Sequence, residues 1–373
     1  MSHYLWQNAL TLLMAVGGCA ASASSLAASN HDGRLKLEYL EVRPIAALTG
    51  PDATDSTQDV DICGTDIGTM AELNGKVYFA FGDTFGFDGT SCTPFGPNWR
   101  SNVLGISSDS NPSDGITWDS WLTGAGSKAI AVSEGAHQPP FTGEQTRIPT
   151  AMVAVNDRLY MHYMSVHGFA QKGGLWLCNN SRFTYSDDEG KTWTEAQSEF
   201  GSYGDTFNML ALTQEAGRGN EGGRYIYAVG TSCGRFGGAR VARVPTDKLL
   251  ELDAWQYYTG KGWSAERDVA VEVIKPAVGE GSILWNSFLK RWLYAYLNEN
   301  TTALELRQAE YPWGPWSDPF TLVTSAEYPQ LYGAFMTPSL LKDGGRTLYF
   351  VMSLFGPYNT YVMEAKLQMR PQR

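Results

Sequence analysis

Three carboxylates in this sequence, Asp66, Asp83 and Glu280, stand among glycine, threonine and aromatic residues. Carboxyl groups that share a partly desolvated site acquire different pKa values, because burial and mutual repulsion disfavour a second negative charge. One group can then donate a proton while its neighbour accepts one. These residues therefore suit general acid and base chemistry, whereas isolated aspartates at such places would only cap turns or bind backbone amides.

The elements that must position these carboxylates recur five times along the chain. A basic residue followed by a short aromatic-rich strand begins at Lys76, Arg158, Arg224, Arg291 and Arg346. A small or apolar run precedes each copy, at residues 65–73, 148–155, 208–212, 282–288 and 335–341. A further strand follows each copy, at residues 102–107, 182–186, 240–244, 304–309 and 361–367. This pattern predicts an all-β fold, a single five-bladed β-propeller over residues 35–369, with one short helix at 246–252.

The repeat also provides an internal comparison between blades. Seven residues after the five starts stand Asp83, Ser165, Thr231, Asn298 and Ser353, so only the first blade has a carboxylate there. Asp66 and Glu280 precede the first and fourth starts, near places where other blades have Thr150 and Thr337. Because propeller ligands bind at the mouth of the central funnel, we predict that Asp66, Asp83 and Glu280 are catalytic.

Other chemistries have weaker support in the sequence. His137, His162 and His167 lack zinc-site spacing, and we expect His162 to be a packed core residue. The segment 186–193 matches the Asp-box pattern, in which Asp188 shapes a hairpin turn and is not catalytic. We expect no metal and no cofactor. An aromatic funnel with carboxylates favours carbohydrate, since aromatic faces stack on sugar rings.

Composition narrows the partners further. The 373 residues are 43% hydrophobic and 18% charged, which excludes a disordered chain or a coiled coil. The net charge of −11 makes nucleic acid and anionic membranes poor partners. No apolar stretch is long enough to span a bilayer, and we expect a monomer.

The N-terminus and the cysteines predict export. Residues 1–28 read as a signal peptide with cleavage after Ala23 or Ala28, although Cys19 within a lipobox-like segment offers lipid anchoring as an alternative. Of three possible disulfide pairings we favour Cys63 with Cys92 and Cys178 with Cys233, because each joins neighbouring segments. Sequons at Asn179 and Asn300 add possible glycosylation sites.

Six ordered motifs resemble a known family over about residues 37–367. The motifs lie at residues 64–68, 81–86, 99–104, 235–238, 314–317 and 328–333. They resemble the domain of unknown function 4185, associated with glycoside hydrolase family 183, the endo-D-arabinanases. The resemblance implies a secreted hydrolase that cuts internal α-D-arabinofuranose bonds, as in the arabinan of mycobacterial arabinogalactan and lipoarabinomannan. Its acidic motif positions fall on Asp66 and Asp83, and Glu280 is similar to a motif of the fourth blade.

The leading hypothesis is therefore an endo-acting, inverting hydrolase of D-arabinan, a polysaccharide. Candidate substrate contacts are Arg100, Asn102, Asn286 and Tyr332. The main alternative is a lectin-like propeller that binds glycans without cleaving them. A hydrolase of another furanoside or of sialic acid ranks lower, because the arginines that could hold a sugar acid all lie in the third blade.

Overall fold

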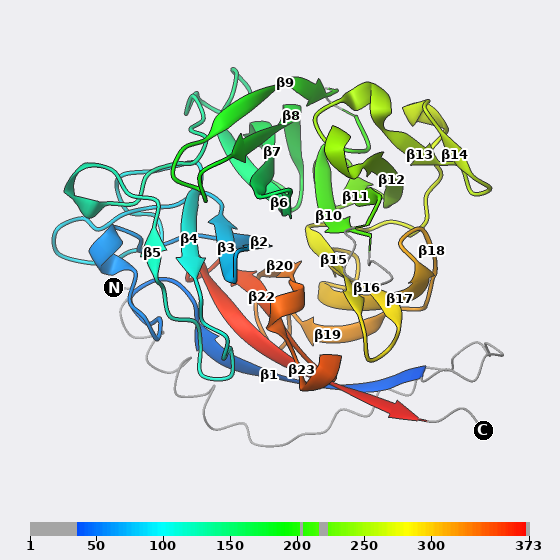
Figure 1. Ribbon diagram of the computed structural model, residues 1–373. Coiled ribbons are helices and arrows are strands. Elements are labelled where there is room, and N and C mark those ends of the chain that lie inside the picture. The colour runs from blue at the N-terminus through cyan, green and yellow to red at the C-terminus, as the bar shows by residue number, and fades with distance from the viewer. Residues whose placement is uncertain (1–35, 202–203, 216–222, 371–373) are drawn as a thin grey trace. The chain divides into compact units, whose positions relative to one another are not determined.

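The computed structural model describes residues 36–201, 204–215 and 223–370. These residues belong to one compact unit, and their strands form five antiparallel sheets arranged around a centre (Figure 1). The fold is thus the predicted all-β, five-bladed propeller. The predicted signal peptide at residues 1–28, including Cys19, lies outside the described residues.

In blades 1 to 4 the strands follow chain order from the centre outward, except that β19 pairs with β17. Blade 1 comprises β2 (Ile67–Leu73), β3 (Lys76–Phe81), β4 (Val103–Ser107) and β5 (Ser120–Trp121). Blade 2 comprises β6 (Thr146–Val155), β7 (Arg158–Phe169), β8 (Trp176–Ser186) and β9 (Thr194–Phe200). Blade 3 comprises β10 (Met209–Gln214), β11 (Tyr225–Thr231), β12 (Arg240–Pro245), β13 (Gln256–Tyr258) and β14 (Trp263–Ser264). Blade 4 comprises β15 (Gly281–Asn286), β16 (Arg291–Asn298), β17 (Ala303–Tyr311), β18 (Gly314–Trp316) and β19 (Phe320–Thr324).

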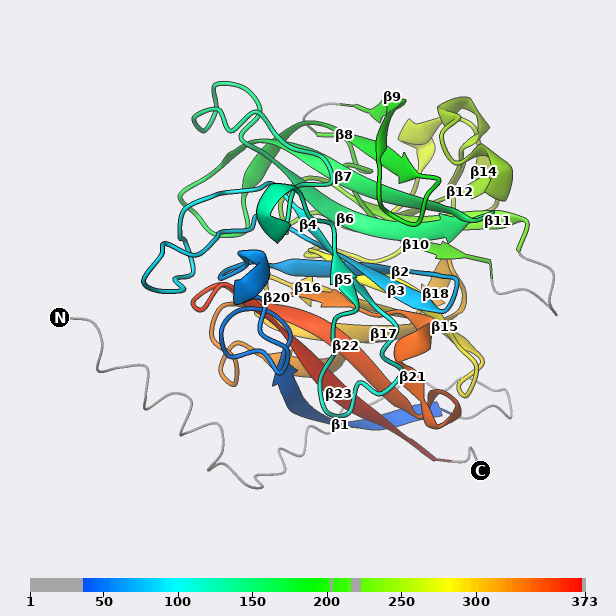
Figure 2. The same ribbon diagram turned by 60° about the vertical axis from the view of Figure 1, so that its left-hand side comes forward.

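Blade 5 joins the two ends of the described chain. It comprises β20 (Leu331–Phe335), β21 (Leu341–Lys342), β22 (Thr347–Leu354), β23 (Asn359–Arg370) and β1 (Lys36–Ala47). β1 lies antiparallel along β23 (Figure 2), and Arg43 on β1 forms a 2.6 Å ion pair with Glu364 on β23. This pairing closes the ring of blades, because the first strand of the unit completes the last sheet.

The inner strands β2, β6, β10, β15 and β20 contact one another in ring order, and β20 contacts β2 again. A small cavity between them, lined by Thr150, Thr231, Glu280 and Phe335 among others, has a volume of about 10 Å³. Such a volume holds about one water molecule.

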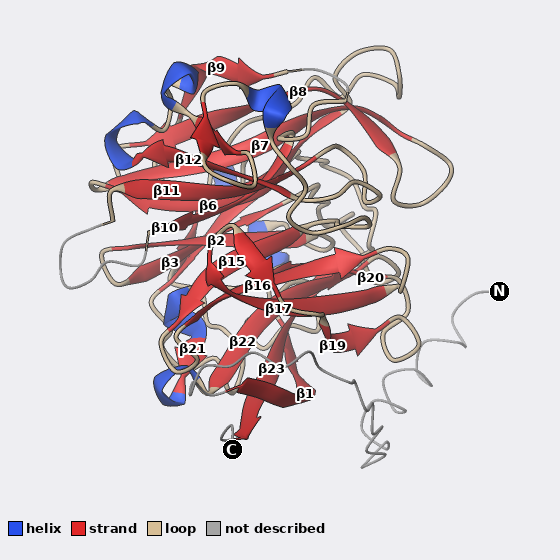
Figure 3. Ribbon diagram, turned by 90° about the vertical axis from the view of Figure 1, so that its right-hand side faces the viewer, coloured by secondary structure: helices blue, strands red, loops and turns tan. Residues whose placement is uncertain are grey.

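Helical structure in the described part of the chain consists of short 3₁₀ turns (Figure 3). They are η1 (Gln58–Val60), η2 (Ala125–Ser127), η3 (Thr246–Lys248), η4 (Leu252–Ala254), η5 (Arg267–Val269), η6 (Pro338–Leu340) and η7 (Asp343–Gly345). The helix predicted at 246–252 is wrong, because η3 and η4 are separate single turns. The small or apolar run at 335–341 does not form one strand, because β20 ends at Phe335 and a 3₁₀ turn that starts at Pro338 separates it from β21.

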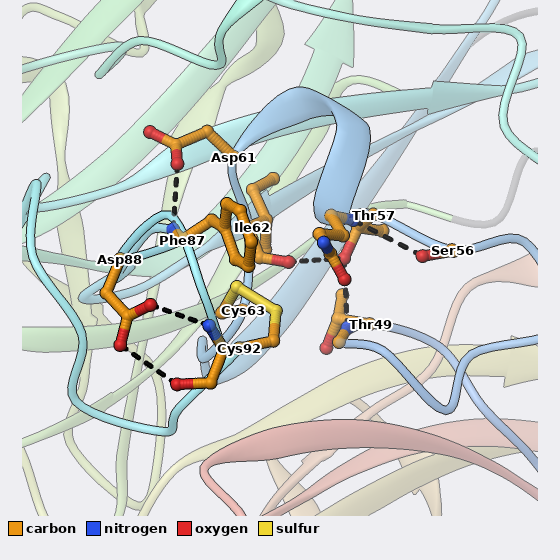
Figure 4. The surroundings of a disulfide bond; sticks show 12 residues. Thr49, Ser56, Thr57, Asp61, Ile62, Cys63, Phe87, Asp88 and Cys92 are labelled. Atoms are coloured by element: carbon orange, nitrogen blue, oxygen red, sulfur yellow. Dashed lines mark hydrogen bonds between the residues drawn. A yellow bond between two sulfur atoms is a disulfide. The ribbon is translucent and has the colours of Figure 1, made fainter.

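Both favoured disulfides are present. Cys63 bonds to Cys92 and ties the segment before β2 to the β3–β4 connection. Figure 4 shows this bond and the backbone amide of Phe87, which donates to Asp61 at 2.8 Å. Cys178 of β8 bonds to Cys233 of the β11–β12 connection, and so joins blades 2 and 3.

Replacing both Cys178 and Cys233 with serine should lower the melting temperature, because the bond closes a loop with a sequence separation of 55. A disulfide that closes a loop of this size stabilises a fold by about 2–4 kcal/mol, because it constrains the unfolded chain. Calorimetry with and without reductant checks this, with Cys63→Ser/Cys92→Ser as the matched control for the other bond. If Cys178→Ser/Cys233→Ser melts at the temperature of the oxidised wild type, the bond contributes nothing to stability.

Candidate active site

The three predicted catalytic residues lie at the same end of the blades. Asp66 precedes β2 and Glu280 precedes β15, while Asp83 follows the end of β3. In an antiparallel sheet the start of one strand and the end of the next lie at the same edge. We call this edge of all five blades the site face.

A β-bulge at the start of β2 orients Asp66. The pairing of β2 with β3 shifts register between Ile67 and Thr69, and both Ile67 (φ 68°) and Gly68 (φ 101°) have positive φ. This conformation strains a β-branched residue and occurs mainly where the surroundings enforce it. The Ile67 amide donates to the Ser353 hydroxyl of blade 5 at 2.9 Å. Bulges of this kind re-aim neighbouring side chains, and here the neighbour is Asp66.

Asp66 is 8% exposed and packs against Gly82. A Cβ atom at Gly82 would lie 2.2 Å from Asp66 Oδ1, so this position requires glycine. Asp66 Oδ2 accepts a 2.8 Å hydrogen bond from the Tyr332 hydroxyl, whereas Oδ1 is buried with no partner among the described residues. The carboxyl group is therefore held through Oδ2, while Oδ1 is packed against the Gly82 backbone.

Burial raises the pKa of Asp66 to about 7. The Tyr332 and Tyr358 hydroxyls lower this pKa, the Glu280 charge raises it and the Arg235 charge lowers it. Desolvation is the largest of these effects, because a carboxylate loses its hydration in the packed mouth of the ring.

Asp83 is also 8% exposed. Its Oδ1 accepts a 2.7 Å hydrogen bond from Trp99 Nε1 and another from the Thr146 hydroxyl at the start of β6. Burial raises the pKa of Asp83 to about 8, and the charges of Asp66 and Glu134 act in the same direction. The charge of Asp66 raises the pKa of Asp83, so the two carboxyl groups titrate as a coupled pair.

Glu280 has a different environment, since it is bound by Arg235 from the β11–β12 connection. Arg235 Nε lies 2.9 Å from Glu280 Oε2 and Nη2 lies 2.9 Å from Oε1, which is a bidentate ion pair. The guanidinium group also stacks 4.9 Å from the centre of the Tyr332 ring. Glu280 therefore lies near Asp66 as a charge whose position Arg235 fixes.

Of the four predicted substrate contacts, only Tyr332 meets the carboxylates, through its bond to Asp66. Arg100 is buried and binds the carboxylate and backbone oxygen of Asp61. Asn102 is 0% exposed, and its amide bonds the backbone of Val132, Ser133 and Arg147.

Asn286 is also 0% exposed, and it binds Gly345 and Leu289. It is the last residue of β15, whose first residue follows Glu280. Asn286 therefore lies at the edge of blade 4 opposite the site face. Nothing in the structure supports a sugar contact by Arg100, Asn102 or Asn286.

Comparing the five repeats did not identify four side chains that surround the carboxylates: Trp99, Thr146, Tyr358 and Arg235. Two of them had a signal, because Trp99 begins one of the six motifs and Arg235 lies in another. Thr146 and Tyr358 lie outside the motifs, and only the closed ring of blades brings them to Asp83 and Asp66.

Two structural roles predicted from sequence are confirmed. Asp188 accepts hydrogen bonds from Thr192 and Ser186 within the β8–β9 turn, away from the site face. His162 is 0% exposed, and burial lowers its pKa to about 3.

Among the described residues, no group of three or more His, Cys, Asp or Glu side chains could hold a metal ion. The same part of the chain contains no helix that is both long and apolar enough to cross a membrane.

Fold and site together define a five-bladed propeller with a buried acid pair at its mouth. The chain belongs to the family described as Domain of unknown function (DUF4185), whose model matches residues 50–364. This match confirms the family predicted from the six motifs. No curated protein matches the sequence.

Several solved structures share the fold at low identity. A putative hydrolase from Bacteroides ovatus is 14% identical with a TM-score of 0.57, and the match covers 83% of this chain and 87% of that one. A family 117 glycoside hydrolase from Zobellia galactanivorans is 12% identical with a TM-score of 0.51, covering 88% of this chain and 91% of that one. At these identities the likeness establishes the propeller fold alone.

The raised pKa values predict how stability depends on pH. Unfolded aspartate titrates near ~3.9, so between about pH 4 and pH 8 the folded state holds protons that the unfolded state has lost. The free energy of unfolding from this pair therefore falls as pH rises through that window. Asp83→Asn keeps the Oδ1 acceptor and removes the charge, so it should melt higher than wild type at pH 8 and equally at pH 4.

Thermal melts at several pH values between 4 and 8 check this prediction. Glu41→Gln, which removes an exposed carboxylate on β1, is the matched control and should follow wild type. If the difference in melting temperature between Asp83→Asn and wild type is the same at every pH, the pKa of the Asp83 carboxyl group is not raised.

Proposed function

We propose that this protein is a secreted, monomeric, endo-acting glycoside hydrolase of D-arabinan that needs no cofactor. The single observation that carries the proposal is the buried pair Asp66 and Asp83, with pKa values raised to about 7 and about 8. Such a pair holds a proton donor and a proton acceptor together near neutral pH. The choice of D-arabinan rests on the resemblance of the acidic motifs to endo-D-arabinanases.

In the proposed mechanism Asp83 protonates the departing glycosidic oxygen, because it has the higher pKa of the pair. Asp66, which is ionised when the pair holds one proton, accepts the proton of the attacking water. Attack by water on an oxocarbenium-like transition state inverts the anomeric centre. Glu280 and Arg235 fix the local charge and do not transfer protons.

Aromatic exposure supports a glycan ligand. All four exposed phenylalanines among the described residues, Phe95, Phe141, Phe169 and Phe355, lie in or beside connections of the site face. They come from blades 1, 2 and 5, so apolar surface lies on more than one side of the carboxylates. This arrangement suits a polymer that continues past the cleaved bond. The family 117 glycoside hydrolase shares the fold, and the proposal extends that class of activity to this chain.

Digestion of purified mycobacterial arabinogalactan tests the proposal. Wild type should release oligosaccharides seen by chromatography, and Asp66→Asn or Asp83→Asn should each lower the rate by roughly 10²–10⁴-fold, the usual value of general acid or base catalysis. Asp188→Asn, in the remote turn, is the matched control. A wild type that releases nothing but binds arabinan, with affinity kept in both site variants, would establish the lectin-like alternative.

The pH profile tests the part assigned to Glu280. Activity should fall below about pH 7 as Asp66 is protonated and above about pH 8 as Asp83 loses its proton. Glu280→Gln removes a negative charge that raises the pKa of Asp66 and leaves Arg235 to lower it, so the acidic limb should move to lower pH. Values of kcat/KM from pH 4 to 10 measure this. An unmoved limb would show that Glu280 does not act on Asp66.

A further inference from the structure

A continuous surface of five aromatic rings leads from solvent to the two aspartates. We call it the aromatic shelf, and its members are Phe85, Phe95, Trp99, Phe355 and Tyr358. Phe85, Phe95 and Trp99 come from the β3–β4 connection of blade 1, and Phe355 and Tyr358 come from the β22–β23 turn of blade 5. The two segments are far apart in the sequence, so the shelf exists only where the ring of blades closes.

The rings pack against one another across the two blades. The centre of the Phe95 ring lies 4.6 Å from that of Tyr358, 5.5 Å from that of Phe85 and 5.7 Å from that of Phe355. Phe85 stacks on Trp99 at 6.1 Å with an interplanar angle of 19°. The group is therefore one connected surface.

The inner end of the shelf touches the catalytic pair. Trp99 donates through Nε1 to Asp83 at 2.7 Å. Tyr358 is buried, and after burial itself the nearby charge of Asp66 is the largest effect that raises the pKa of its hydroxyl. A sugar residue bound beside the aspartates would thus lie against these rings.

The outer end of the shelf remains open. Phe95 is 54% exposed and Phe355 is 50% exposed, although each is large and apolar. No arginine or lysine of the described chain stacks on any of the five rings, whereas Arg235 covers the Trp176 and Tyr332 rings. Exposed apolar surface beside a polar site typically marks a ligand position.

The segment that carries Phe95 is held in place before any ligand binds. The Cys63–Cys92 disulfide anchors it, and Asp88 accepts hydrogen bonds from the backbone and hydroxyl groups of Thr90 and Ser91. A fixed platform reduces the entropy lost on binding.

We propose that the aromatic shelf is a subsite for an uncharged glycosyl residue adjacent to the bond that is cleaved, with Phe95 and Phe355 stacking on its apolar ring face. This inference rests on the proposed function, and it specifies where the part of the polysaccharide on one side of the cleaved bond binds. The His137 ring, whose centre lies 4.0 Å from that of Trp99, binds Glu134 through Nε2. An anionic sugar is disfavoured, because no arginine or lysine stacks on the shelf and Asp66 and Asp83 lie at its inner end.

Isothermal titration calorimetry tests the shelf without catalysis. The probe is the oligosaccharide fraction from partial acid hydrolysis of mycobacterial arabinan, and the protein carries Asp83→Asn to prevent cleavage. Adding Phe95→Ala and Phe355→Ala should weaken binding by about 10- to 100-fold, since two half-exposed phenyl groups lose their contact with the sugar. Adding Tyr311→Ala, an aromatic of 46% exposure at the end of β17 opposite the site face, is the matched control and should leave affinity unchanged.

Phe95→Leu with Phe355→Leu keeps the apolar volume and the fold while removing the aromatic faces, and it should also weaken binding. Equal affinity of the alanine, leucine and parent proteins overturns the subsite, as does a parent that binds no oligosaccharide at millimolar concentration. Oligosaccharide binding that depends on the phenyl rings, in a wild type that releases no product, leaves the subsite standing and rejects the hydrolase.

Discussion

The structure of the site depends on keeping two carboxyl groups together where water cannot hydrate either fully. Burial alone would favour the neutral form of both carboxyl groups or push one of the side chains out to solvent, so hydrogen bonds from the surrounding groups must hold each carboxyl group in place. Tyr332 binds one oxygen of Asp66, and Trp99 with Thr146 binds one oxygen of Asp83. The bulge at Ile67 and the missing side chain at Gly82 make the space. A bulge, a positive φ at a β-branched residue and a glycine within a β-sheet each lower stability, and here all three position the two aspartates.

All five blades contribute to that arrangement. Blade 1 supplies both aspartates, and the connection that leads into blade 2 ends at Thr146. Arg235 comes from blade 3, Glu280 precedes the first strand of blade 4, and Tyr332 belongs to blade 5. The pairing of β1 with β23 closes the ring and so holds the tyrosines of blade 5 against the aspartates of blade 1. Closure therefore matters for the electrostatics of the site as much as for the stability of the sheets.

The repeat in the sequence was sufficient to predict the five blades and the place of Asp66 and Asp83, because strand spacing fixes which residues reach one edge. It could not separate a charged side chain that faces a ligand from one that faces the protein. Arg100 and Asn102 stand beside Trp99 in one motif, yet they bind Asp61 and the backbone near Ser133. The apolar run at 335–341 also does not locate the inner strand of blade 5, since β20 ends at Phe335 and has a register shift between Tyr332 and Phe335. Contacts between blades, such as that of Thr146 with Asp83, cannot be predicted from the spacing of residues within one repeat.

The balance of charge at the mouth bears on the kind of sugar that fits. When Asp66 and Asp83 share one proton they carry one negative charge, and the Arg235 and Glu280 pair adds none. Glu134 and Glu299 lie at the edges of this group and add further negative charge. A sugar carboxylate would meet repulsion there, whereas an oxocarbenium-like transition state would be stabilised. A neutral sugar polymer satisfies both conditions, and the aromatic shelf offers it apolar surface at Phe95 and Phe355.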